Sequence, residues 1–144
     1  MKEQEALDYF RDGFNCAQSV FTVFAKEKNI DESTALKIAC GFGGGMGRLQ
    51  ATCGAVTGAY MAIGLNHGKS LDDDGNEKRE KTYSLVKTFD SEFKKIFSTT
   101  SCRELMQCDL NTEAGKKFAT EHNLAEKVCE RCVMEAVKIV EKIA

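Results

Sequence analysis

Cysteines are the residues of this sequence whose number and placement point most clearly to chemistry. There are seven, spread over the whole chain: Cys16, Cys40, Cys53, Cys102, Cys108, Cys129 and Cys132. The count is odd, and the first residues lack the apolar segment of a signal peptide, so the disulfide framework of a secreted protein is not indicated. We therefore expect a cytoplasmic protein, in which grouped cysteines usually bind a metal or carry out redox chemistry.

Three cysteines share one local setting at the predicted start of a helix. Each follows a residue that commonly caps helices, in the dipeptides Asn15-Cys16, Thr52-Cys53 and Ser101-Cys102. In the first and third, a Gln or Glu three residues after the cap completes a capping box. Unpaired N–H groups and the positive dipole of a helix start favour thiolate, which is both nucleophile and metal ligand. The alternative is that cysteine simply packs well at a crowded helix start.

The other cysteines give weaker signals. Cys129 and Cys132 form a C-x-x-C pair in the last predicted helix, without the βαβ pattern that accompanies thioredoxin-like pairs. Cys132 lies in the apolar stripe of that helix, which favours core packing. Cys40 ends a helix, where the dipole disfavours thiolate, so we expect a structural role. Cys102 and Cys108 are near enough in sequence to meet in space.

Helical periodicity predicts one all-α domain over residues 1–144, a compact bundle of about six to eight helices. The chain contains no proline, and no segment alternates as a strand does. The helix that starts near Cys53 is almost uncharged from Ala51 to Leu65, which predicts a buried central helix. Small residues recur along it at helical spacing and would let another helix approach closely: Ala51, Gly54, Ala55, Gly58, Ala59 and Ala62. Helices are expected at residues 3–11, 16–28, 31–40, 53–64, 74–97, from 102, 112–121 and 124–143.

A glycine-rich turn at residues 41–48 joins two of these helices. It lacks the Gly-Lys-Ser/Thr of a nucleotide-binding loop and follows no strand, so nucleotide binding is not indicated. The simpler interpretation is a tight turn between packed helices. The alternative is a cofactor-binding segment, in which backbone N–H groups and a guanidinium lie against an anion, a thiolate or a cluster. Its residues would be Gly43, Gly44, Gly45 and Arg48.

Composition and spacing argue against several other functions. A net charge of −2 leaves no basic surface for nucleic acid, and no run of eighteen apolar residues could span a membrane. The acidic segment 72–76 places its glycine too early for a calcium-binding EF-hand, so it is expected to be a solvated loop. His67 and His122 lie near polar helix ends and are expected to face solvent rather than bind a metal.

With these motifs in view, the chain resembles the C_GCAxxG_C_C family of redox-active proteins, which share four cysteines and a C-G-A-x-x-G motif. Residues 53–58 match the motif, and residues 13–18, 41–48 and 102–105 also resemble the family, in the same order. The family usually has a glycine after the last of these segments, where this chain has Met106-Gln107.

The resemblance implies four site cysteines: Cys16, Cys53, Cys102 and Cys129. Cys132 lies three residues after the last of these and is a second candidate for its place.

Three functions remain open at this point. The four cysteines could bind a metal centre assembled by tertiary packing, an iron–sulfur cluster in first place and zinc in second. They could instead act without metal as catalytic thiols that form reversible disulfides, with Cys53 attacking and an unknown electron or thiol partner. A non-catalytic helical metal-binding or interaction module, in which the cysteines are structural, is the third. We expect a redox-active cysteine centre with no nucleic-acid or membrane partner, and a homodimer would suit a bundle of this size.

Overall fold

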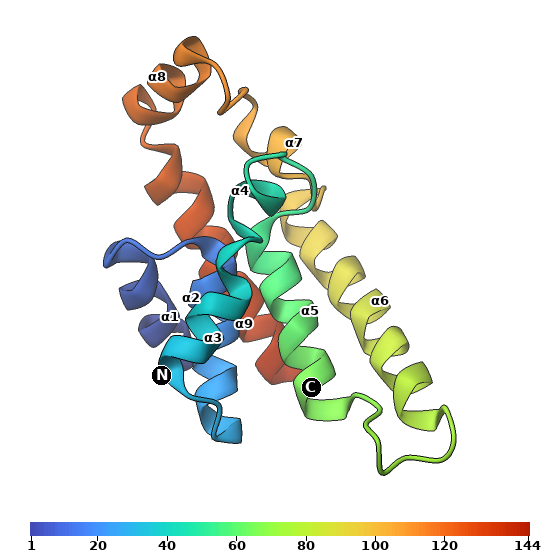
Figure 1. Cartoon of the computed structure of the whole chain (residues 1–144). Helices are drawn as coiled ribbons and strands as arrows, with labels where there is room; N and C mark the ends of the chain where they lie inside the picture. Colours follow the sequence, from blue (N-terminus) through green and yellow to red (C-terminus); the bar gives the residue numbers. More distant parts are fainter.

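The chain folds into helices joined by short turns, in a computed structural model that describes residues 1–144 (Figure 1). The helices are α1 (Lys2–Arg11), α2 (Cys16–Ala25), α3 (Glu32–Cys40), α4 (Gly43–Met46), α5 (Gly54–His67), α6 (Glu77–Phe97), α7 (Cys102–Met106), α8 (Glu113–Glu121) and α9 (Glu130–Ile143). A 3₁₀ turn at Lys26–Lys28 follows α2, and a π-helical turn at Ala125–Cys129 precedes α9. The only β-type pairing is an isolated bridge between Thr52 and Ser101. The all-α prediction is confirmed.

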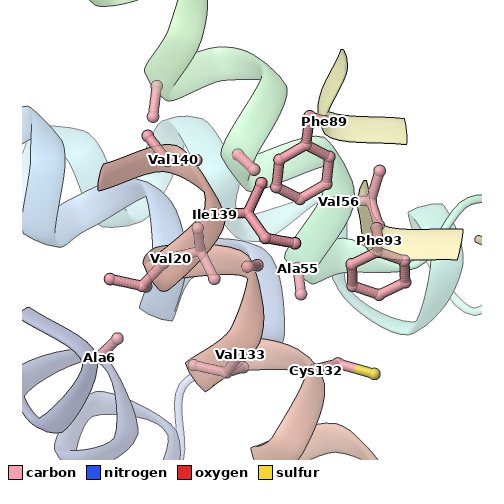
Figure 2. Close-up of a cluster of buried hydrophobic side chains, with 14 of the residues drawn as sticks. Ala6, Val20, Ala55, Val56, Phe89, Phe93, Cys132, Val133, Ile139 and Val140 are labelled. Atoms are coloured by element: carbon pink, nitrogen blue, oxygen red, sulfur yellow. The ribbon is translucent and has the colours of Figure 1, made fainter. Parts of the chain in front are cut away.

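Helix α5 lies in the middle of the molecule, in contact with α2, α6 and α9 (Figure 1). Several of its apolar side chains are completely buried, among them Val56 and Ile63, whereas Met61 and Leu65 are half-buried. Figure 2 shows Val56 beside two phenylalanine rings of α6, Phe89 and Phe93, which are also completely buried. A stripe along one face, from Thr57 through Tyr60 to Gly64, and the last turn of the helix are half-buried. The sequence therefore correctly predicted the central helix, which is buried on most of its sides.

Two glycines set how closely α5 approaches α2. Gly54 and Gly58 are four residues apart and lie on one face of the helix. A Cβ atom at Gly58 would stand 2.9 Å from the carbonyl oxygen of Ala17, and one at Gly54 would stand 3.1 Å from the nitrogen of Ala17. Ala17 is itself completely buried. The predicted stripe of small residues is thus the contact with α2, and it places the start of α5 beside the start of α2.

The expected start of α6 was wrong by three residues. The sequence favoured a capping box opening at Asp74, whereas α6 begins at Glu77 and its preceding residue, Asn76, makes no side-chain cap bond. The acidic segment forms a turn of its own, because Asp73 accepts a hydrogen bond from the backbone N–H of Ser70 at 2.9 Å. Because Asp73 takes part in this turn, the helix begins after it, at Glu77.

None of the helices combines the length and the apolar character that a membrane crossing requires. Neither histidine lies with the cysteines. His122 is exposed and stacks on the ring of Phe118, while His67 is half-buried and its ring nitrogen lies 3.2 Å from the carbonyl oxygen of Ala144.

Candidate functional site

Five of the seven cysteines line one cavity of about 330 Å³. Its walls come from the starts of α2, α5 and α7, from α4 and from the last helical segment. The cysteines are Cys16, Cys53, Cys102, Cys129 and Cys132. This set contains all four predicted site residues and adds Cys132. Cys40 is exposed at the end of α3, and Cys108 packs against Cys102 behind the cavity wall, so these two lie outside it.

The segments that precede α5 and α7 run antiparallel, and their contact brings two cysteines to the cavity. The backbone N–H of Cys53 donates to the carbonyl of Thr100 at 2.7 Å. The N–H of Cys102 donates to the carbonyl of Ala51 at 2.6 Å. Backbone hydrogen bonds, and not side-chain packing alone, therefore hold Cys53 and Cys102 near each other, although they are 49 residues apart in sequence (102 − 53).

Cys16 is fixed at the first position of α2 by the predicted capping box. The Asn15 side chain accepts from the N–H of Gln18, and the Gln18 side chain accepts from the N–H of Asn15, each at 2.9 Å. The Asn15 amide also donates to the carbonyl of Cys40 at 2.9 Å, which ties the start of α2 to the end of α3. A Cβ atom at Gly54 would stand 3.2 Å from the Cβ of Cys16. The glycine thus lets Cys16 lie directly against the start of α5.

The last helical segment contributes two cysteines to the cavity. The N–H of Glu130 bonds to the carbonyl of Ala125, five residues back, so a π turn precedes α9. Such turns redirect the side chains of a helix and are frequent at functional sites. The sequence left two candidates for the fourth site cysteine, Cys129 and Cys132. Both of them line the cavity. Cys132 is also only 1% exposed and belongs to the main core, as its apolar neighbours predicted.

Cys53 and Cys132 form the deeper of two thiol pairs. Hydrogen bonding between them lowers the pKa of Cys53 and raises that of Cys132 well above its usual range. Burial opposes the shift at Cys53, while the backbone N–H groups of Ala55 and Val56 support it. These amides act as nearby dipoles, since the Cys53 sulfur makes no cap hydrogen bond of ordinary geometry. Of this pair, Cys53 thus has the lower pKa.

Cys16 and Cys129 form the second pair, and both side chains are half-buried. Hydrogen bonding between them raises the pKa of Cys16 and lowers that of Cys129, although burial opposes the shift at Cys129. The Cys129 sulfur also lies 3.7 Å from the sulfur of Met106. In addition, Cys129 lines a separate hollow of about 470 Å³ below α8. Cys129 thus has the lower pKa of the pair and borders two hollows.

The expectation that three helix starts favour thiolate is supported at Cys53 alone. Cys53 occupies the cap position itself, not the first turn after Thr52. Burial raises the pKa of Cys102 to about 12, and neighbouring cysteines add to the effect. Helix α7 has only five residues, so its dipole offers little compensation. At Cys16 the hydrogen bond to Cys129 and burial outweigh the helix start.

The glycine-rich loop forms one wall of the cavity. Gly44 and Gly45 line it together with Arg48, whereas Gly43 packs under the Asn15 side chain and does not reach it. Both cavity glycines have left-handed backbone conformations, with φ of +67° and +69°. Three of the four residues proposed as a cofactor-binding segment are therefore at the cavity.

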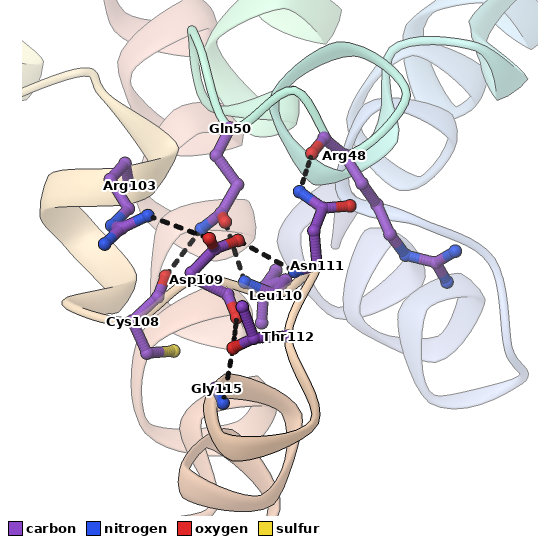
Figure 3. A network of polar contacts seen from close by, with 9 residues as sticks. All are labelled: Arg48, Gln50, Arg103, Cys108, Asp109, Leu110, Asn111, Thr112 and Gly115. Carbon is purple, nitrogen blue, oxygen red and sulfur yellow. Dashed lines mark hydrogen bonds and ion pairs between the residues drawn. The ribbon is translucent and has the colours of Figure 1, made fainter.

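A buried glutamine anchors this loop to the chain after α7 (Figure 3). The Gln50 side chain donates to the carbonyl of Cys108 at 2.9 Å and accepts from the N–H of Leu110 at 2.8 Å. The Asn111 side chain donates to the carbonyl of Arg48 at 2.8 Å. Sequence reasoning missed Gln50, because a lone glutamine in a polar turn gives no signal of burial.

The ligand groups at the cavity are thiols, with no histidine or carboxylate among its lining residues. That donor set suits soft metals and iron–sulfur clusters. No three Cys, His, Asp or Glu side chains converge on a point where one ion could bind. The strongest mutual effects on pKa are instead between two thiols at a time, Cys53 with Cys132 and Cys16 with Cys129.

Residues 14–143 match the family described as "Putative redox-active protein (C_GCAxxG_C_C)". The chain belongs to this family. Neither the curated proteins nor the solved structures provide a match. The family motif at residues 53–58 now has a physical explanation. Cys53 lines the cavity, and Gly54 and Gly58 have no side chains that would keep α2 at a distance. Membership agrees with a redox role for the thiols.

Proposed function

We propose that this protein is a thiol–disulfide redox protein with an outer pair, Cys16–Cys129, and an inner pair, Cys53–Cys132. The observation that carries the proposal is the gathering of Cys16, Cys53, Cys129 and Cys132 around one cavity, where neighbouring thiols shift one another's pKa values. In each pair one cysteine has a lowered pKa and the other a raised one. This division supplies a nucleophile and a proton donor at the same place.

The reaction begins at the outer pair. The Cys129 thiolate attacks one sulfur of a substrate disulfide, whose S–S bond breaks as a mixed disulfide with Cys129 forms. The first substrate thiolate leaves and takes from solvent a proton equivalent to the one that Cys129 released on becoming a thiolate. Cys16 then loses its proton and attacks the Cys129 sulfur, which expels the second substrate thiolate to take up that proton. Two cysteine thiols have then been oxidised to one disulfide by two electrons, and the substrate disulfide has become two thiols.

Exposure and pKa support this order. Cys129 is half-buried, borders two hollows and has a lowered pKa, whereas Cys53 is only 6% exposed. A substrate sulfur therefore meets Cys129 first, in place of the attack by Cys53 expected from sequence. The inner pair reduces the outer disulfide by the same two steps, with Cys53 attacking and Cys132 completing the new disulfide.

A metal centre is the second candidate function, because every ligand group at the cavity is a thiol. Its ligands would be Cys16, Cys53, Cys102 and Cys129, with iron–sulfur favoured over zinc. The closest contacts pair Cys53 with Cys132 and Cys16 with Cys129, so these thiols would have to separate to hold a cluster.

The two functions are separated by preparing the protein without oxygen. We expect a colourless protein without stoichiometric iron or zinc, which loses four thiols to a mild disulfide oxidant and regains them with dithiothreitol. Broad visible absorption with bound iron, or one tightly held zinc, would favour the metal centre. Seven thiols that stay reduced under the oxidant, in a metal-free protein, would contradict both functions.

A further inference from the structure

Arg48 is the only charged residue, the thiols aside, that lines the cysteine cavity. No carboxylate of the chain pairs with it, and Figure 3 shows its side chain running away from the polar network around Gln50. The other four arginines have partners: carboxylates for Arg11, Arg79 and Arg103, and the ring of Phe97 for Arg131. Arg48 is an exposed residue whose guanidinium has no partner in the chain, so it is available to a ligand anion that enters the cavity.

The position of Arg48 is fixed by its surroundings. Its carbonyl accepts the hydrogen bond from Asn111, and its backbone has a left-handed conformation with φ of +62°. Such a conformation is uncommon for residues other than glycine and persists where the surrounding structure holds it. A Cβ atom at Gly44 would stand 2.8 Å from the Cγ of Arg48, so the arginine stem lies over Gly44 at the cavity wall.

The loop beside Arg48 adds further donors. The backbone N–H groups of Gly44 and Gly45 donate to no group of the chain. Both residues line the cavity. These two glycines and Arg48 belong to one loop at the cavity, while apolar side chains such as Leu105 and Val128 come from α7 and from the π turn before α9.

We propose that the cavity binds a small disulfide that carries a carboxylate, with the carboxylate on Arg48 and a sulfur at Cys129. A volume of about 330 Å³ suits a small molecule rather than a folded protein segment. An arginine and a carboxylate form strong charge-assisted hydrogen bonds, which the apolar lining would strengthen further. This inference rests on the proposed thiol–disulfide function and names its class of substrate.

The test compares three small disulfides of similar size: 3,3′-dithiodipropionate with two carboxylates, 2-hydroxyethyl disulfide without charge, and cystamine with two ammonium groups. The rate at which each oxidises the reduced full-length protein is measured by thiol counting. Arg48→Gln should slow the dicarboxylate about tenfold more than it slows the neutral disulfide, the loss of roughly one charge-assisted bond. Arg79→Gln, which removes the same charge away from the cavity, should change neither rate.

The outcomes separate this inference from the function on which it rests. If Arg48→Gln slows all three disulfides equally, or none of them, while the neutral one still oxidises the protein, the carboxylate specificity is wrong and the thiol–disulfide function stands. If none of the three oxidises the wild-type protein, the proposed function fails and the inference fails with it.

Discussion

Replacing Gly58 by alanine tests the close contact between α5 and α2 that sets Cys16 beside the start of α5. Alanine favours a helix over glycine by about 1 kcal/mol, so the substitution would stabilise an unhindered site. At Gly58, however, the new Cβ would stand 2.9 Å from the carbonyl oxygen of Ala17 and 3.2 Å from the Cβ of Val20. A backbone oxygen cannot rotate away, so α2 must shift.

The matched control lies in the same helix. A Cβ atom at Gly64 meets no atom within 4 Å, so Gly64→Ala should gain helix propensity without a clash. Overpacking of a well-packed contact costs about 1–3 kcal/mol. Because the propensity gain of about 1 kcal/mol applies to both variants, Gly58→Ala should be less stable than Gly64→Ala by about 1–3 kcal/mol.

Urea unfolding followed by far-ultraviolet circular dichroism, in reducing buffer, measures this difference. The reducing buffer prevents disulfides from altering the unfolded state. A Gly58→Ala protein as stable as Gly64→Ala would refute the argument that these helices are in contact at Gly58.

Three further predictions concern single side chains. Gln50→Ala should lower the free energy of unfolding by about 2–4 kcal/mol, because it leaves the buried carbonyl of Cys108 and the N–H of Leu110 without partners. The control, Gln4→Ala at an exposed position, should lower it little. Equal losses of the two variants in urea unfolding would contradict the anchoring role of Gln50. Thr22→Val should stabilise the protein by about 1 kcal/mol, because the buried hydroxyl of Thr22 has no hydrogen-bond partner. A lower free energy of unfolding in this variant would show instead that the hydroxyl is bonded. Burial raises the pKa of Cys102 from about 9 to about 12, so the folded protein keeps this proton at pH values where the unfolded chain loses it. Stability should therefore fall as pH rises from about 9 toward 12, and less steeply in Cys102→Ala; parallel slopes would show that Cys102 does not carry the effect.

The starts of α2, α7 and α8 could be predicted from sequence because the interactions that fix them are local. Asn15 and Gln18 are three residues apart, and their reciprocal hydrogen bonds need only the first turn of α2. The glycines of the central helix were equally informative, since a four-residue spacing places them on one face whatever lies opposite. Which helix would fill that face could not be derived, because it depends on packing between distant segments.

The thiol pairs could not be predicted for the same reason. Cys132 sits in an apolar stripe, and that pattern looks the same whether a cysteine only packs or also faces a cavity. The π turn before α9, which affects the direction of Cys129, has no recognisable sequence signal. The pKa values of Cys16 and Cys102 were misjudged because burial and neighbouring thiols, both products of tertiary structure, outweigh the local helix start.

Mapping the disulfides of the oxidised protein tests the central claim most directly. The reduced protein is treated with 2-hydroxyethyl disulfide, quenched with an alkylating agent and digested, and the linked peptides are identified by mass spectrometry. We expect Cys53–Cys132 after the first equivalent of oxidant, because the inner pair reduces the outer disulfide as it forms. After the second equivalent we expect Cys16–Cys129 as well, with Cys40, Cys102 and Cys108 outside both pairs. Links that join Cys40 or Cys108 to the cavity cysteines, or a random mixture of pairings, would contradict this claim.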